Sequence, residues 1–359
     1  MAENNNEEIL LLKKEVNYAV KLLTNGQINE ALKIVEALIK KSPNVPLLYN
    51  IRGVCYQTIR ELGNAIDDFS QATILKSDYA EAYCNLGVTY QEKGDLVSAV
   101  NAYKNAIDND NNYPTAHNNL GKIFLASGEI DSSIEHLECA ITLKSDFADA
   151  HNNLGSAFLR INKLNDAIKS YKKAIALKPD FAVANNNLGI AYLRTGDPKL
   201  ASKFFENAIT ITPGYATAHH NLSGVKVYKE KDKQVSLIES LLIENNLSQK
   251  ERIYLNFALA KAYEDLGNHE ELFKHLNEGN RIRKKEMSNS IADSEEHNEL
   301  IKLFFNSNNI NNIKLTYRDS LPIRPIFIVG MPRSCLLYPS DAADDPIRFM
   351  SVCRSYHYN

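Results

Sequence analysis

An apolar run followed by an arginine and a serine is the part of this sequence most suggestive of anion-binding chemistry. Residues 326–329 predict a buried strand, and Gly330 predicts a turn after it. Arg333 and Ser334 follow that turn. A guanidinium, a hydroxyl and the N–H groups of a loop can together bind a phosphate. Residues 325–334 therefore predict the first strand and phosphate-binding loop of an α/β domain.

A nucleoside-triphosphate loop is the alternative for this segment. Its pattern, GxxxxGK[ST], requires a second glycine followed by a lysine. In this chain Cys335 stands five residues after Gly330, and no lysine follows. The nucleoside-triphosphate alternative therefore fails. A strand and a proline turn can also form in any α/β domain, so the surrounding sequence has to support the assignment.

Asparagines recur at one position every 34 residues, and their amides could bind a polypeptide backbone. The set is Asn85, Asn119, Asn153, Asn187 and Asn221. An amide side chain offers both a donor and an acceptor to a peptide bond. A row of such amides would hold an extended peptide with little regard for its side chains. The alternative is that these asparagines are structural hydrogen-bond partners inside the repeats.

Three histidines follow the same period, two residues before an asparagine of the row. They are His117, His151 and His219. Equivalent side chains in neighbouring repeats stand roughly 10 Å apart, about one helix-packing distance, so they do not converge on a metal ion. We interpret these histidines as polar residues that line the same surface, and the sequence predicts no metal site.

The elements that position these side chains are defined by glycines that recur with the same period. Those glycines are Gly53, Gly87, Gly121, Gly155 and Gly189. Aromatic residues follow three positions later, at Tyr56, Tyr90, Phe124, Phe158 and Tyr192. Large apolar residues follow sixteen positions later, at Phe69, Tyr103, Leu137, Tyr171 and Phe205. The pattern resembles the tetratricopeptide repeat, a pair of antiparallel helices. The resemblance implies an all-α superhelical solenoid whose first helices line the concave surface.

We divide the chain into five parts, two of which are the predicted strand and loop at residues 325–334 and the tail at residues 335–359. We assign residues 12–230 to the repeat array and residues 231–285 to a degenerate capping repeat. Residues 286–324 are rich in polar residues and asparagine and form a connecting region. Within the array, Gly26, Gly94, Gly128 and Gly196 fall where the turn inside a repeat is expected. The array is similar to the repeat domain of the protein O-linked N-acetylglucosamine transferases, which carry such an asparagine ladder.

The order of the parts also resembles bacterial repeat-bearing sulfotransferases related to the tyrosylprotein sulfotransferases. In that family the loop reads PRSGTT, of which only Arg333 and Ser334 are matched after the proline. The resemblance implies that these two residues bind the 5′-phosphosulfate of 3′-phosphoadenosine-5′-phosphosulfate. We expect the catalytic domain to be almost wholly missing after Ser334, so no catalytic residue is assigned, and the chain as given is expected to bind no cofactor.

The sequence of residues 335–359 indicates a non-native origin. The stretch SCLLYPSDAADD, residues 334–345, resembles the translation of a sequencing-library adapter apart from Pro339. No helix or strand periodicity runs through this tail. We expect residues 335–359 to be non-native, the alternative being a genuine divergent terminus.

Composition narrows the classes of partner. The 359 residues carry a formal net charge of −3, and the sequence pI is near 6.3, which gives no reason to expect a nucleic-acid or membrane partner. The five cysteines form no CxxC pair, which is typical of free thiols in a reducing compartment. The start lacks the order of a signal peptide. We therefore expect a cytoplasmic protein.

The sequence favours a repeat module that binds a protein or an extended peptide in its groove. The resemblance attaches that module to a sulfotransferase dependent on 3′-phosphoadenosine-5′-phosphosulfate, which transfers a sulfuryl group to a hydroxyl acceptor. Two alternatives remain, a scaffold without enzymatic activity and a glycosyltransferase of the O-linked N-acetylglucosamine type. The asparagine ladder does not distinguish between them.

Overall fold

The computed structural model describes residues 2–244 and 246–286, and every regular element within these residues is an α-helix. The helices are α1 Ala2–Thr24, α2 Ile28–Lys41, α3 Pro46–Thr58, α4 Leu62–Leu75, α5 Ala80–Lys93, α6 Leu96–Asn109, α7 Pro114–Ser127, α8 Ile130–Leu143, α9 Ala148–Arg160, α10 Leu164–Leu177, α11 Ala182–Arg194, α12 Pro198–Ile211, α13 Ala216–Val225, α14 Lys233–Ile243, α15 Gln249–Asp265 and α16 His269–Glu286. The expected all-α solenoid is confirmed. The predicted strand and loop at residues 325–334, and residues 335–359, lie outside the described residues.

The helices fall into two compact units. Unit 1 is Met1–Pro213 and holds α1 to α12. Unit 2 begins at Gly214 and holds α13 to α16. In the part of the chain that the structure describes, no helix combines the length and the apolar character needed to cross a membrane.

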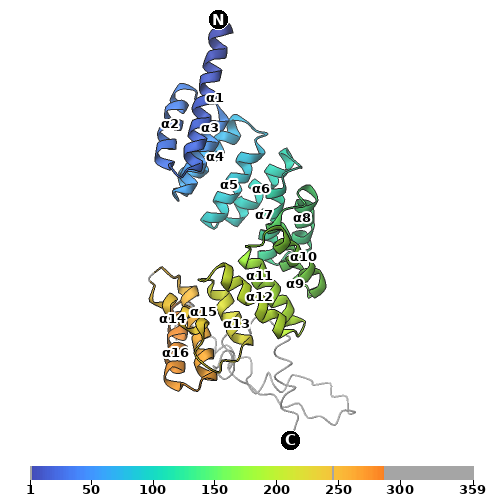
Figure 1. Cartoon of the computed structure of the whole chain (residues 1–359). Helices are drawn as coiled ribbons and strands as arrows, with labels where there is room; N and C mark the ends of the chain where they lie inside the picture. The colour runs from blue at the N-terminus through green and yellow to red at the C-terminus, as the bar shows by residue number, and fades with distance from the viewer. Residues whose placement is uncertain (1, 245, 287–359) are drawn as a thin grey trace, which may run out of the picture. The chain divides into compact units, whose positions relative to one another are not determined.

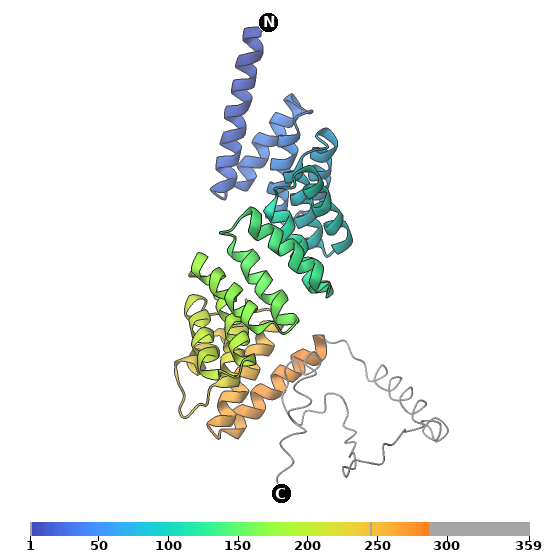
Figure 2. The same cartoon turned by 90° about the vertical axis from the view of Figure 1, so that its right-hand side faces the viewer.

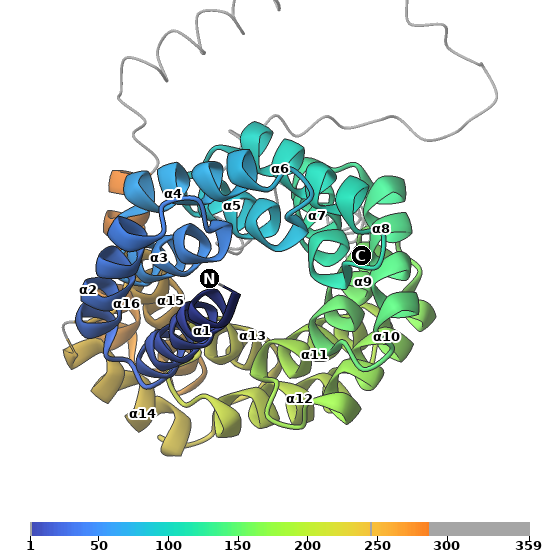
Figure 3. The same cartoon turned by 90° about the horizontal axis from the view of Figure 1, so that it is seen from above.

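Unit 1 is a stack of antiparallel helix pairs in chain order (Figures 1 and 2). Each pair joins an odd-numbered helix to the even-numbered helix that follows it. Figure 3 shows α3, α5, α7, α9 and α11 on the inner side of the curve of this unit, with their even-numbered partners outside them. We call the side lined by these five odd-numbered helices the inner face.

Close approach within each pair depends on the recurring glycine. A Cβ atom added at Gly155 would lie 2.7 Å from two ring atoms of Tyr171, which is closer than real side-chain contacts. Tyr171 comes from the facing helix α10 and is fully buried. Gly87 meets the ring of Tyr103 in the same way. The large residue sixteen positions after each glycine therefore fills the space that the missing side chain leaves open.

The turn inside each repeat needs a residue with positive φ. The predicted turn glycines have it, with φ values of 78° at Gly26, 89° at Gly94, 86° at Gly128 and 81° at Gly196. At the same repeat position the remaining two turns use Arg60, with φ 67°, and Asn162, with φ 59°. The left-handed region is unfavourable for a residue with a Cβ atom, although asparagine tolerates it better than most. The glycines were predicted from the sequence, whereas these two substitutes were not.

We expect the substitution Arg60→Gly to raise the free energy of unfolding by about 0.5–1 kcal/mol, because it removes left-handed strain. The ion pair that would be lost, Arg60 Nη1 to Glu92 Oε2 at 3.0 Å, involves an arginine side chain that is 76% exposed and so contributes little. Urea denaturation followed by circular dichroism measures the change. Asn162→Gly is the control and should give a smaller gain. A loss of stability in Arg60→Gly would show that the strain is absent.

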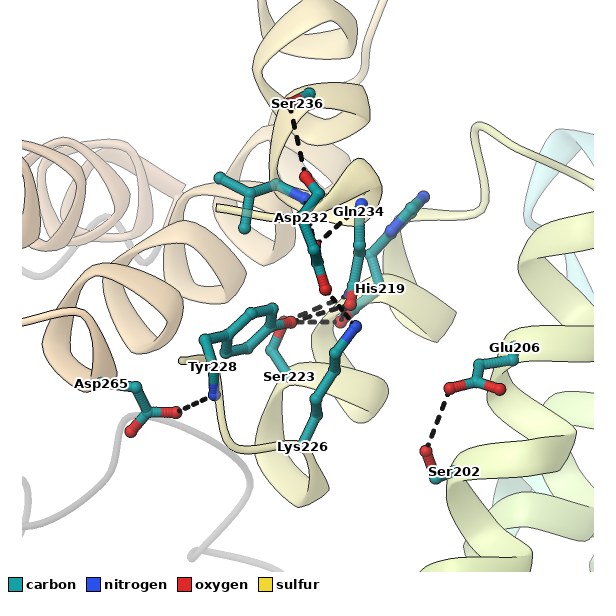
Figure 4. Close-up of polar contacts among 11 residues, drawn as sticks. Ser202, Glu206, His219, Ser223, Lys226, Tyr228, Asp232, Gln234, Ser236 and Asp265 are labelled. Carbon is teal, nitrogen blue, oxygen red and sulfur yellow. Dashed lines mark hydrogen bonds and ion pairs between the residues drawn. The ribbon is translucent and has the colours of Figure 1, made fainter. Parts of the chain in front are cut away.

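Unit 2 departs from the regular repeat through a buried polar cluster after the short helix α13 (Figure 4). The Tyr228 hydroxyl donates to Gln234 Oε1 at 2.8 Å and lies 2.9 Å from Ser223 Oγ. The Gln234 amide in turn donates to the carbonyl of His219 at 3.2 Å. Burial raises the pKa of Tyr228, so its hydroxyl stays protonated. These bonds fasten the end of α13 to the start of α14, and we interpret the cluster as structural.

Candidate functional site

The predicted asparagine row lies on the odd-numbered helices that line the inner face of unit 1. Its first four members lie one on each of the helices α5, α7, α9 and α11: Asn85, Asn119, Asn153 and Asn187. All four side chains are half-buried, so each keeps some contact with solvent. The fifth predicted member, Asn221, lies on α13 in unit 2 and is also half-buried.

A second set of asparagines recurs one position earlier in the repeat than the row. Its members are Asn50, Asn118, Asn152 and Asn186. All four are buried, with exposures between 2% and 7%. No role was predicted for these asparagines, although they recur at the same 34-residue spacing, interrupted only by Cys84. The period that revealed the first row could therefore have revealed the second.

Amides of the two sets bond across neighbouring repeats. Asn153 Nδ2 donates to Asn118 Oδ1 at 3.0 Å, and Asn187 Nδ2 donates to Asn152 Oδ1 at 3.0 Å. Asn85 Nδ2 donates to Asn50 Oδ1 at 3.0 Å in the same way. Each bond joins residues 35 positions apart, from the half-buried row in one repeat to the buried set in the repeat before it.

Bonds within a repeat complete a continuous chain of amides. Asn152 Nδ2 donates to Asn153 Oδ1 at 3.4 Å, and Asn118 Nδ2 donates to Asn119 Oδ1 at 3.2 Å. The chain therefore runs from Asn187 to Asn119 without interruption. Because successive amides polarise one another and fix their neighbours' orientation, the chain sets the rotamers of the half-buried row.

The hydrogen-bonded chain of amides is interrupted at Cys84, which occupies the position of a buried asparagine. Cys84 stands 35 residues before Asn119, and burial raises the pKa of its thiol to about 12, so it stays neutral. A thiol is a weak acceptor. Asn119 Nδ2 instead donates to the hydroxyl of Tyr103 at 3.3 Å, and that hydroxyl donates to Gln91 Oε1 at 3.2 Å.

The row retains hydrogen-bonding capacity after these internal bonds are made. An amide carries two N–H donors and an oxygen with two lone pairs. Within the described part of the chain, Asn85, Asn119, Asn153 and Asn187 each donate a single side-chain hydrogen bond. Each amide can therefore offer a further N–H and a lone pair to a ligand. A peptide group, with one donor and one acceptor, matches that pair.

The interpretation of the histidines as surface residues is wrong for two of the three. His117 is buried, and its Nδ1 lies 3.0 Å from Nδ1 of His136 on α8. His219 is fully buried on α13. His151 is half-buried, and its Nε2 lies 3.1 Å from the carbonyl oxygen of Ser145. Among the described residues no group of three or more His, Cys, Asp or Glu side chains is placed to hold a metal ion.

The His117–His136 pair predicts a dependence of stability on pH. Burial lowers the pKa of both imidazoles. The neighbouring His136 lowers the pKa of His117 further, and Lys104 lowers the pKa of His136 further. Glu135 raises both pKa values and so opposes these shifts. The unfolded chain, with histidine pKa values near 6.5, then binds more protons than the folded chain. The free energy of unfolding should therefore fall as the pH drops below about 6.5. Urea titrations between pH 7.5 and 5.5 measure the slope.

His136→Phe is the control for this dependence, because it removes one imidazole and keeps an aromatic ring against Phe124, which stacks on His136. Since His275 also has a pKa lowered mainly by burial, part of the slope should survive in the variant. Equal slopes in the two proteins would show that folding does not lower the pKa of this pair.

The predicted phosphate-loop residues, Arg333 and Ser334, lie outside the described residues. Their expected role in binding 3′-phosphoadenosine-5′-phosphosulfate therefore stays a prediction.

Comparison with protein families identifies the repeats. A family model described as "TPR repeat" matches residues 61–94, 90–128, 121–162 and 157–196. A second, described as "Tetratricopeptide repeat", matches residues 182–215. No curated protein matches the chain.

Several solved structures are similar to this chain. The structure titled as the APC/C hetero-tetramer Cut9–Hcn1 is 19% identical, with a TM-score of 0.56, and the match covers 67% of this chain and 48% of that chain. MamA is 27% identical with a TM-score of 0.41, covering 46% of this chain and 96% of its own. YrrB, titled "a TPR protein with an unusual peptide-binding site", is 20% identical with a TM-score of 0.43, covering 52% and 96%.

Proposed function

We propose that this all-helical array, whose residues 61–215 are tetratricopeptide repeats, binds an extended polypeptide segment along the asparagine row of its inner face. Asn85, Asn119, Asn153 and Asn187 contact the backbone of the ligand. The proposal covers unit 1 alone. Tetratricopeptide arrays are interaction modules in which neighbouring repeats build one extended surface.

The observation that carries the proposal is the pairing of a buried and a half-buried amide in successive repeats. The buried amides of Asn118 and Asn152 bond to the half-buried row and fix its orientation. A ligand then meets side chains that lose little rotamer freedom on binding, which reduces the entropic cost of association. A structural role alone would not require the second amide of each pair to remain half-exposed.

The test is a variant with Asn119, Asn153 and Asn187 all changed to alanine. Its ligand is the fluorescently labelled dodecapeptide acetyl-(Gln-Ser-Thr)4-amide, and the readout is fluorescence anisotropy. Losing three or more hydrogen bonds at roughly 0.5–1.5 kcal/mol each should weaken binding by an order of magnitude or more. Binding is measured well below the melting temperature of the variant, so that the repeats remain folded.

A matched control carries three alanines in place of exposed asparagines on the outer helices, at Asn64, Asn101 and Asn105. This variant should bind the peptide as the unchanged protein does. Equal affinity in the inner-face variant and the control would refute the proposal.

A second candidate function rests on the residues from Pro325 to Ser334. We propose that they begin a sulfotransferase domain that uses 3′-phosphoadenosine-5′-phosphosulfate, with Arg333 balancing the charge of the 5′-phosphosulfate and Ser334 supplying an amide and a hydroxyl. The array would then present a protein acceptor to that domain. The sulfotransferase assignment is supported by the order of the residues: the apolar run 326–329, then Gly330, then Arg333 and Ser334.

Two measurements test this second candidate. In the given chain Cys335, Leu336 and Leu337 supply no hydroxyl to the loop, so calorimetry with adenosine 3′,5′-bisphosphate should show no binding. Sequencing the source gene across the codon for Ser334 should give a glycine and two threonines next. A gene that encodes Cys335 to Asn359 as written would contradict the sulfotransferase assignment.

A further inference from the structure

Three basic side chains lie on the same face of their helices as the asparagine row. Lys122 follows Asn119 by three residues on α7. Arg160 and Arg194 each follow their row asparagine by seven residues, on α9 and α11. Residues three, four and seven apart share one side of an α-helix. At 1.5 Å per residue, the three basic residues lie about 4.5 to 10.5 Å further along the helix axis than the asparagines. We call these three residues the basic edge.

The charges of the basic edge are not neutralised by neighbours. All three side chains are exposed, and none forms an ion pair with a carboxylate of the described residues. The Arg194 guanidinium donates to the carbonyl of Leu159 at 3.1 Å, which fixes its position without neutralising it. In a chain whose formal net charge is −3, three cations without ion pairs on one side of the asparagine row point to an anionic ligand.

The basic edge has a defined beginning. On the preceding inner helix, α5, the positions that correspond to Lys122 and Arg160 carry Val88 and Glu92. Glu92 is paired with Arg60, so α5 adds no positive charge at these positions. On α9 the one carboxylate of this face, Asp149, precedes Asn153 by four residues and so lies on the other side of the row. The positive stretch therefore runs from α7 to α11.

The spacing of the basic edge matches a particular backbone conformation. Arg160 and Arg194 occupy equivalent positions in neighbouring repeats, which stand roughly 10 Å apart, and Lys122 lies about one helical turn closer to the asparagine row. A polyproline II segment has three residues per turn and rises about 3.1 Å per residue, so every third side chain points the same way at intervals of roughly 9 Å. An extended segment on the asparagine row can thus direct one side chain in three toward the basic edge.

We propose that the partner of the inner face is an acidic polypeptide segment, with a carboxylate side chain at about every third residue, and that Lys122, Arg160 and Arg194 select it. The inference rests on the proposed function, because the asparagine row must first hold the backbone. The basic edge then sets the preference among peptides that the row would otherwise bind alike.

The test compares acetyl-(Glu-Ser-Thr)4-amide with acetyl-(Gln-Ser-Thr)4-amide by fluorescence anisotropy. Exposed ion pairs contribute modestly, so the acidic peptide should bind the unchanged protein about tenfold more tightly at low ionic strength. In 1 M salt the advantage should largely disappear, because the screening length falls to about 3 Å. In the variant Lys122→Gln, Arg160→Gln, Arg194→Gln the two peptides should bind equally, with the affinity for the neutral peptide unchanged.

A variant of equal charge serves as the control. It replaces Lys104, Lys169 and Lys203, which are exposed on the outer helices, with glutamine. The control should keep the preference for the acidic peptide. If it loses the preference as fully as the basic-edge variant does, long-range charge and not the basic edge is responsible.

Failure of the inference and failure of the proposed function give different results. If the unchanged protein binds both peptides equally, the asparagine row still binds peptides but the proposed selection of acidic segments is wrong. If neither peptide binds, the proposed function and the proposed selection are both wrong. If a single-stranded dodecanucleotide displaces the acidic peptide from the basic edge at lower concentration than unlabelled acidic peptide does, the surface selects nucleic acid and the proposal is wrong.

Discussion

Replacing Gly155 with alanine should lower the free energy of unfolding by about 1–3 kcal/mol, which is the usual range for an overpacked core. The added Cβ atom would lie 2.7 Å from two ring atoms of Tyr171 and 3.0 Å from a third. Tyr171 has no exposed surface, so its ring cannot swing into solvent to relieve the contact. Helices α9 and α10 would have to separate, which would disturb the packing of this repeat against its neighbours.

Urea denaturation measures this loss, and Gly63→Ala is its matched control. Gly63 is a helical glycine on α4 with no atom within 4 Å of the position of an added Cβ. Alanine has the higher helix propensity, so this control should be neutral or slightly stabilising. If Gly155→Ala were as stable as the control, the glycine would not be the cause of the close helix contact.

The second large effect is expected from Asn152→Ala, which removes a buried link of the amide chain. Asn152 is 7% exposed; it accepts from Asn187 and donates to Asn153. The substitution leaves one donor and one acceptor without their partner. An unsatisfied polar group costs about 1–3 kcal/mol when water cannot replace the bond. We expect the lower part of that range per group, because Asn153 and Asn187 are half-buried.

The same substitution should weaken peptide binding, although Asn152 itself is buried. Without it, Asn153 and Asn187 lose the contacts that fix their orientation, so ordering them becomes part of the cost of binding. Anisotropy with the neutral dodecapeptide and urea denaturation are measured on the same protein. The control is Asn101→Ala, an exposed asparagine on α6. A stability loss without any loss of affinity would show that the row does not depend on the buried amides.

The repeat architecture could be predicted because its signals recur at a fixed distance. Glycine packs against a large side chain in every regular repeat, and the two residues are sixteen positions apart each time. Helix ends at Gly94 and Gly128 were equally predictable, because glycine is the residue that adopts positive φ most readily. A pattern of residue types was sufficient wherever one residue type suits one geometry.

Other features could not be predicted because they depend on the partners of a side chain. Arg60 and Asn162 occupy the glycine position of the turn, and their residue types do not indicate positive φ. The 34-residue period defines the asparagine row, which lies on the inner helices, but the period does not show that Asn118 and Asn152 bond to the row. His117 carried the same period, and its burial against His136 follows only from the packing of α7 and α8.

The central claim, that the row holds the backbone of an extended peptide, is tested most directly by changing the ligand and leaving the protein unaltered. Acetyl-(Gln-Ser-Thr)4-amide is compared with the same peptide N-methylated at every serine, which removes backbone N–H donors and keeps every side chain. Calorimetry should show that methylation weakens binding by tenfold or more, while replacing every Gln side chain with alanine changes the affinity little. Equal binding of the methylated peptide, together with a strong effect of the side-chain replacement, would contradict the account.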